Sequence, residues 1–149
     1  MSDQPQFAVQ LKLLEGYRFE IDFGDMGQIF SDETPPLGDA SGPNPSRLLA
    51  ASVANCLAAS LLFAIRKFKE DPGQVSATVR GELERQDGRW RIGQLAVELQ
   101  LGVDAQSIEH LERVLAQFEN FCVVTQSVRQ GIRVEVAVKD AAGTLVHQS

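Results

Sequence analysis

Two cysteines are the residues of this chain with the most distinctive chemistry. Cys56 lies in a long apolar segment, and Cys122 follows an aromatic segment much later in the sequence. Two cysteines are too few for a disulfide scaffold, and their wide separation does not fit a compact zinc site. His110 and His147 are the two histidines, too few for a His-rich metal site. Thiol chemistry is therefore the first hypothesis, and the two thiols could close a disulfide if their Cα atoms approach within about 7 Å.

Each cysteine also has a plain structural interpretation. Ser52 and Ser60 lie four residues to either side of Cys56, on one face of a predicted helix. In that view Cys56 is a small core residue, and both serines bond back to their own helix. Cys122 stands near a predicted helix N-terminus, a position that lowers the pKa of a thiol. Two interpretations stay open: a reactive dithiol, and two unrelated core cysteines.

The elements that would position these thiols follow from the spacing of apolar residues. Alternating patterns predict strands, and three- or four-residue spacing predicts helices. The order predicts a single α+β domain over residues 1–149. Its parts are an N-terminal hairpin at about 7–23, a loop at about 32–45, a central helix at about 45–69, a hairpin at about 75–101, a helix at about 105–118, a short helix at about 122–129 and a strand at about 132–138.

The central helix is unusually apolar. Asn44 can cap it and Pro45 suits its first turn. Residues 48–65 are interrupted by only three polar side chains, which is long enough to raise the question of a membrane span. We expect no membrane association, because six of these residues are alanine and the surrounding chain is acidic. A helix apolar on nearly all sides needs more cover than one small domain supplies, so we expect an obligate homodimer.

Charge and the N-terminal sequence narrow the function classes. Fourteen basic and twenty acidic residues give a formal charge of −6, which argues against nucleic-acid binding. The first ten residues do not have the pattern of a signal peptide, so we expect a cytoplasmic protein with free thiols. Neither a phosphate-binding Gly-rich loop nor a serine nucleophile elbow is present in the sequence.

Two segments carry a family resemblance. The stretch GPNPSRLLAASVANC, residues 42–56, resembles the signature of the OsmC/Ohr family of osmotically inducible and organic-hydroperoxide-resistance proteins. The stretch ENFCVV, residues 119–124, is similar to the segment that holds this family's second cysteine. With their spacing and the order of elements, the two motifs cover about residues 7–138.

The resemblance implies a fold and a chemistry. The fold would be an intertwined homodimer with two β-sheets around long central helices and active sites at the dimer interface. Cys56 would be the peroxidatic cysteine and Cys122 the resolving one, reducing organic hydroperoxides through a sulfenic acid and then a disulfide. A lipoyl-type dithiol would regenerate the thiols, with no bound cofactor. Phe63, Phe68, Phe118 and Phe121 are expected in the core, and some could form an apolar wall for an alkyl hydroperoxide.

The catalytic arginine is the part of this pattern in which the sequence departs from the family. In the best-characterised branch of the family an acidic residue after the Asn-Pro pair orients the arginine, and here that position is Ser46. Arg18 is the candidate, since it lies in the N-terminal strand region that supplies the family's arginine; Arg47 and Arg129 are the alternatives. The missing carboxylate favours a second hypothesis, a non-catalytic dimer that binds an apolar ligand or senses redox state. We expect His110 to be an ordinary solvated histidine.

Overall fold

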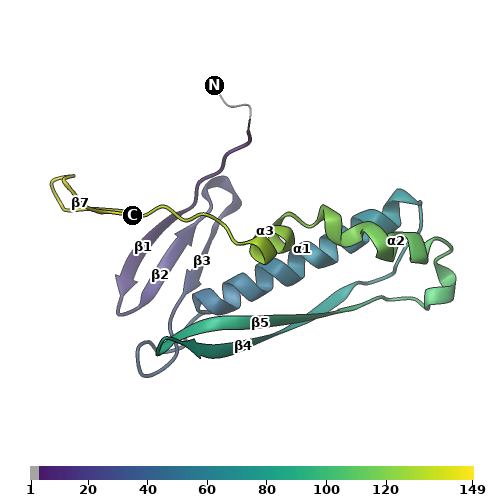
Figure 1. Cartoon of the computed structure of the whole chain (residues 1–149), viewed down its shortest axis with the longest axis horizontal. Helices are drawn as coiled ribbons and strands as arrows, with labels where there is room; N and C mark the ends of the chain where they lie inside the picture. Colours follow the sequence, from purple (N-terminus) through teal and green to yellow (C-terminus); the bar gives the residue numbers. More distant parts are fainter. Residues whose placement is uncertain (1–3) are drawn as a thin grey trace. The chain divides into compact units, whose positions relative to one another are not determined.

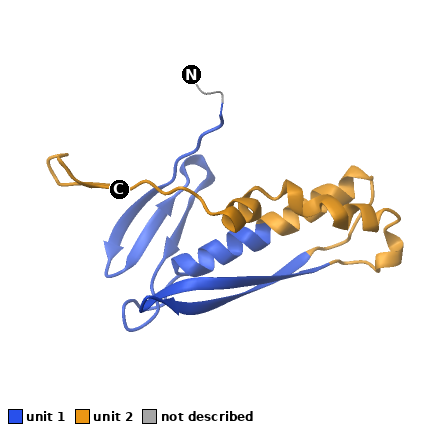
Figure 2. Ribbon diagram, in the orientation of Figure 1, with its two compact units in different colours: residues 1–55, 76–100 blue, residues 56–75, 101–149 orange. Residues whose placement is uncertain are grey.

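The computed structural model describes residues 4–149 and has the predicted α+β composition (Figure 1). The chain forms two compact units (Figure 2). Unit 1 comprises the chain up to Asn55 together with residues 76–100, and unit 2 comprises residues 56–75 and 101–149. Both cysteines belong to unit 2, whereas Arg18 and Arg47 belong to unit 1.

The first sheet of unit 1 has three antiparallel strands: β1 (Gln10–Glu15), β2 (Arg18–Asp22) and β3 (Gln28–Ser31). The first two form the predicted N-terminal hairpin. The third was missed, because it has four residues and follows a 3-10 turn without an alternating pattern of its own. Ile21 of β2 pairs with Ile29 of β3, and Ile21 is the buried apolar residue of this sheet.

The second hairpin agrees with its prediction in detail. Strands β4 (Ser76–Gln86) and β5 (Arg89–Gln100) are joined at Asp87 and Gly88. Both turn residues have positive φ, 52° and 77°, as a type I′ turn requires. Glu82 faces Gln94 and Leu83 faces Ile92, which leaves Gly93 as the extra residue of a β-bulge. The bulge explains why the apolar positions of β5 change face at this glycine.

Helix α1 (Pro45–Lys67) is the predicted central helix, two residues shorter at its C-terminal end. Asn44 caps it, because its Oδ1 atom accepts a hydrogen bond from the Arg47 amide at 3.1 Å. Lys69 has a φ of 59°, which ends the helical path before the predicted boundary. By length and composition α1 could cross a membrane, a test that the core helix of a soluble protein also passes. Of its most apolar stretch, 39% is buried within the chain.

The predicted helix at 105–118 is interrupted in the structure. It comprises a 3-10 turn (Ala105–Ser107), an extended Ile108 and then α2 (Leu111–Gln117). The apolar spacing is real, since Ile108 and Val114 are both buried, but the backbone at Ile108 (φ −112°, ψ 103°) is not helical. A second 3-10 turn (Phe118–Phe121) leads to α3 (Val123–Gln130), the predicted short helix.

The C-terminal strand prediction was wrong in its position. Residues 131–136 have no regular secondary structure, and the last strands are β6 (Ala137–Lys139) and β7 (Leu145–Gln148). A strand needs a partner for its backbone groups, and β7, which was not predicted, begins its pairing with β6 at Ala137. The described chain therefore has three small sheets where two were expected.

Candidate active site

Cys56 lies on the part of α1 that belongs to unit 2 and is half-buried. Ser60 follows one helical turn later and is buried at 6% exposure. Ser52, one turn before, donates its hydroxyl to the carbonyl oxygen of Leu48 at 2.8 Å. The interpretation of a serine bonded back to its own helix is therefore right for Ser52.

Cys122 occupies the N-cap of α3 and is completely buried. Its Sγ atom lies 2.9 Å from the Oγ1 atom of Thr125 and accepts a hydrogen bond from the Thr125 amide at 3.4 Å. An N-cap side chain satisfies one of the unpaired amides of the first helical turn, and here sulfur takes the place of the usual oxygen. Because this sulfur can accept hydrogen bonds at the positive end of α3, the site favours a thiolate.

The two cysteines are brought together. The side chains of Cys56 and Ser60 both form hydrogen bonds with the sulfur of Cys122. Burial raises the pKa of the Cys122 thiol, but the hydrogen bonds from Thr125, Cys56 and Ser60 outweigh it, and the net pKa is below its ordinary value. Both thiols are free, so the arrangement is a reduced dithiol in contact.

Two phenylalanines that are near the cysteines in the sequence form an aromatic pair. The rings of Phe63 and Phe121 meet edge to face, with centroids 5.5 Å apart. Both were expected in the core, but they are 56% and 42% exposed. Lys67 covers the Phe121 ring, with its Nζ atom 5.7 Å from the centroid. The pair is therefore an accessible apolar surface with a cation over one of its two rings.

The three candidate arginines have different surroundings. Arg129 pairs with Glu119 at 2.6 Å, and Arg47 lines a cavity of about 440 Å³ between the first half of α1 and the hairpin of β4 and β5. Arg18 lies on β2 with its guanidinium 4.7 Å from the centre of the Phe30 ring. Its buried Nε atom has no hydrogen-bond partner among the described residues. Arg18 is thus the candidate with a buried donor that has no partner among the described residues.

Asp32 organises the loop near Arg18 in unit 1. The carboxylate is 4% exposed and accepts hydrogen bonds from the amides of Glu33, Asp39 and Ser41 and from the Ser41 hydroxyl. The Ser41 hydroxyl and amide hold the pKa of Asp32 below its ordinary value against the opposing effect of burial, and the amides of Asp39 and Glu33 add to them. Arg18 and Asp32 line the same cavity of about 370 Å³.

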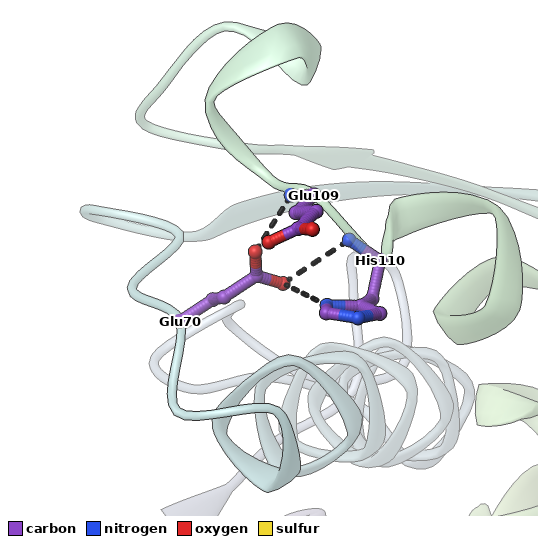
Figure 3. A group of neighbouring side chains, drawn as sticks. All are labelled: Glu70, Glu109 and His110. Carbon is purple, nitrogen blue, oxygen red and sulfur yellow. Dashed lines mark hydrogen bonds and ion pairs between the residues drawn. The ribbon is translucent and has the colours of Figure 1, made fainter.

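Sequence reasoning missed a polar group formed by Glu70, Glu109 and His110 (Figure 3). The Glu70 carboxylate accepts the Glu109 amide at 2.6 Å and the His110 amide at 3.4 Å, and lies 3.8 Å from His110 Nδ1. The His110 ring stacks on Phe68 at 4.6 Å, so it is not the freely solvated side chain we expected. The three side chains include types that can ligate a cation, but the amide contacts identify Glu70 as a cap for the turn before α2.

No sequence signal pointed to this group. Glu70 is far from Glu109 and His110 along the chain, and a glutamate just after a helix is unremarkable in composition. His110 lies one residue before the start of α2, so the apolar spacing of this helix predicts only approximately where the His110 side chain lies. Its contact with Phe68 depends on how the end of α1 meets this turn.

Comparisons with known proteins agree with this architecture. A model of the OsmC-like protein family matches residues 38–137. No curated protein sequence matches the chain significantly. Among solved structures, an OsmC-like protein from Mycoplasma pneumoniae is similar with a TM-score of 0.69 and 16% identity, covering 88% of this chain and 91% of its own.

Two further structures have comparable similarity. An OsmC-like protein from Vibrio cholerae has a TM-score of 0.66 and 14% identity, covering 83% of this chain and 94% of its own. An organic hydroperoxide resistance protein from Legionella pneumophila has a TM-score of 0.61 and 19% identity, covering 85% and 92%. Because the family match includes both cysteine motifs and two thirds of the residues, the chain belongs to the OsmC-like protein family.

Proposed function

We propose that this protein is a cysteine-based peroxidase that reduces organic hydroperoxides with Cys56 and Cys122. The observation that carries the proposal is the hydrogen bond between the two thiols, one half-buried and one fully buried at a helix N-terminus. The similarity to the Legionella pneumophila organic hydroperoxide resistance protein supports the same class of reaction.

The reaction assigns one step to each thiol. The Cys56 thiolate attacks the terminal peroxide oxygen, the O–O bond breaks, and the alkoxide takes up a proton and leaves as an alcohol. Cys56 is now a sulfenic acid. The Cys122 thiolate attacks its sulfur, the S–O bond breaks, hydroxide leaves as water after protonation, and a disulfide forms. A lipoyl-type dithiol then reduces this disulfide and is itself oxidised to a cyclic disulfide.

The partially exposed Cys56 suits the first role because the peroxide must reach it. The exposed Phe63–Phe121 pair suits a substrate with an alkyl group more than hydrogen peroxide, since it offers apolar surface but few polar groups. Cofactors are not required by this chemistry, because the oxidising and reducing equivalents come from the hydroperoxide and the dithiol.

We assign the activating positive charge to Arg18. Its guanidinium carries an unpaired buried Nε donor, whereas Arg129 is engaged by Glu119. A cation stabilises a thiolate and the developing negative charge on the peroxide oxygen. Ser46 stands in place of the acidic residue of the best-characterised family branch, so any orientation of Arg18 would come from other groups in this protein.

The functional form that we propose is a cytoplasmic homodimer. Less than half of the most apolar stretch of α1 is buried within one chain. Large apolar side chains on other elements are also exposed, among them Leu11, Leu83 and Trp90. A second copy of the chain would cover surface of this kind, as an obligate dimer does.

The experiment is a thiol titration before and after addition of cumene hydroperoxide. The proposal predicts that both thiols are lost rapidly and that dihydrolipoamide restores them. Cys56→Ser abolishes turnover, and Cys122→Ser leaves Cys56 open to over-oxidation. Ser52→Ala is the matched control, because it removes a hydroxyl one turn from Cys56 that is bonded to its own helix. Full activity in either cysteine variant would overturn the assigned roles.

Ser46 also supports a second candidate, a non-catalytic dimer that binds an apolar ligand or senses redox state. The cavity beside Arg47 has mostly apolar walls and could hold such a ligand. A ligand-binding protein should keep both thiols in the presence of hydroperoxide while a fluorescent fatty acid binds, so the thiol titration separates it from the peroxidase. A redox sensor should lose its thiols but should not consume hydroperoxide continuously when dihydrolipoamide is supplied.

A further inference from the structure

The sulfur of Cys122 is held by hydrogen-bonding groups from two helices. In the first turn of α3 the Thr125 amide donates to the sulfur at 3.4 Å, and the Cys122 thiol donates to the Thr125 hydroxyl oxygen at 2.9 Å. When the thiol loses its proton, the same hydroxyl becomes a donor to the thiolate. Ser60 contributes a hydroxyl from α1. Cys122, Ser60 and Thr125 are all buried, at 0%, 6% and 5% exposure. Water therefore competes little for these hydrogen bonds, and each counts for more than it would at the surface.

Ser60 and Ser52 are a natural comparison within α1. They lie symmetrically about Cys56, but only the Ser52 hydroxyl is bonded to the carbonyl one turn before it. The Ser60 hydroxyl is directed to the Cys122 sulfur. A serine on a buried helix face can bond to the backbone of its own helix. The contact between the Ser60 hydroxyl and the Cys122 sulfur is therefore not needed for the stability of α1.

We infer that Ser60 and Thr125 are positioning residues that hold Cys122 as a thiolate pointed at Cys56, ready for the disulfide-forming step. This inference rests on the proposed peroxidase function for the reaction it serves. The hydrogen bonds themselves are independent of that function. Hydroxyl donors to a thiolate are charge-assisted and about twice as strong as neutral hydrogen bonds.

The step gains from this arrangement in two ways. The attacking group must be a thiolate, and its lone pair must face the sulfenic sulfur. Three donors around one sulfur satisfy the first requirement and restrict its direction. In the step, a Cys122–Cys56 S–S bond forms, the S–O bond of Cys56 breaks, and the departing hydroxide takes up a proton to become water. Ser60 and Thr125 keep their own protons throughout.

Because the donors are neutral, the inference makes a specific prediction about the effect of salt on the ionisation of Cys122. Of the charged side chains on the neighbouring parts of these elements, Lys67 covers Phe121, Glu119 pairs with Arg129, and Arg66 is exposed. The other titratable group facing the sulfur is the Cys56 thiol. Stabilisation by neutral hydroxyls is insensitive to salt, whereas stabilisation by a nearby exposed cation would weaken as ionic strength rises.

The first experiment measures the ionisation of Cys122 without any peroxide. In the Cys56→Ser background Cys122 is the single thiol, and its ultraviolet thiolate absorbance gives its titration curve. Ser60→Ala and Thr125→Val should each move this curve to higher pH, while Thr125→Ser and Ser52→Ala should leave it in place. The curve should also be the same at low and high salt. Unchanged curves in both Ser60→Ala and Thr125→Val would overturn the inference.

The second experiment follows the step itself with both cysteines present. After one equivalent of cumene hydroperoxide, dimedone traps the sulfenic acid and mass spectrometry follows the disulfide. Ser60→Ala and Thr125→Val should form the disulfide about tenfold more slowly, with sulfenic acid formation unchanged. A merely structural role would slow both steps or lower the melting temperature alone. If hydroperoxide yields no sulfenic acid, the peroxidase proposal fails. The inference is then tested with diamide as the oxidant, by the same comparison of disulfide formation rates, for which we again expect a difference of about tenfold.

Discussion

The side chain of Cys56, in the middle of α1, lies close enough to Cys122, the N-cap of α3, to hydrogen-bond with its sulfur and lower the pKa of its thiol. Residues distant in the sequence thus form a contact pair whose two members differ in access: Cys56 is half-buried and Cys122 is fully buried. Two unrelated core cysteines do not require that one of them occupies a helix N-cap with hydroxyl groups around its sulfur.

Contact between the thiols predicts an intramolecular disulfide under mild oxidation. Diamide should lower the number of titratable thiols from two to zero, and the product should run as a single chain on a non-reducing gel. Dihydrolipoamide should restore both thiols. Loss of thiols through crosslinked dimers would contradict the contact.

Arg18 is expected to matter more than the other two candidate arginines. Arg18→Met should lower kcat/KM for cumene hydroperoxide by about a hundredfold, since it removes the donor that we assign to the reacting oxygen. Arg129→Met is the matched control, because it breaks an ion pair with Glu119 that is largely exposed. Steady-state kinetics check this, and an equal loss in both variants would remove Arg18 from the site.

Glu70 is expected to stabilise the fold through the two amides that it caps. Glu70→Ala should lower the free energy of unfolding by about 1 kcal/mol, or the melting temperature by about 3 °C. Glu109→Ala should change little, because its exposed carboxylate caps nothing. Thermal unfolding followed by circular dichroism measures both variants. If both substitutions instead lower the melting temperature equally, and a chelator lowers that of the unsubstituted protein to the same value, the group holds a metal ion.

Asp32 should make stability depend on acid pH. Its pKa is lower in the folded chain than the ordinary value of 3.8, so folding favours the carboxylate. The resulting stabilisation is fully present above the ordinary pKa and is lost as pH falls through the lowered folded value. Asp32→Asn should therefore reduce the melting temperature at neutral pH and flatten its decline below about pH 4. Asp39→Asn serves as the control, because only its backbone enters the network.

The proposed dimer is tested by light scattering. One chain has a mass of 16.3 kDa, and we expect a species of twice that mass that persists on dilution. A monomer at micromolar concentration would show that the apolar surface of α1 is covered in some other way.

Local patterns predicted most of the fold, and long-range contacts account for the rest. The hairpin of β4 and β5, its turn at Asp87 and its bulge at Gly93 all follow from neighbouring residues. The break at Ile108 does not, because it depends on Glu70 capping the turn that follows. The position of the last strand depends in the same way on pairing with β7.

The candidate site divides along the same line. Both cysteines are recognisable in the sequence because the chain has only two and both lie in predicted helical segments. The family resemblance implied that they act as a pair. Ser60 was noticed only as a neighbour of Cys56, and Thr125 not at all, because their role is defined by the Cys122 sulfur rather than by any spacing along the chain. The environment of Arg18 likewise depends on Phe30 from a strand that the pattern did not reveal.

The segment just before β6 has one more consequence, for handling the protein. Ile132, Val134 and Val136 alternate there and are exposed, which is the composition of a ribbon that could recruit other copies edge to edge. Arg133 and Glu135 alternate with them and form an ion pair at 2.6 Å, so charged side chains separate the apolar residues of this segment. We expect these two charged side chains to oppose edge-to-edge association, and neutralising both should lower the solubility of the protein.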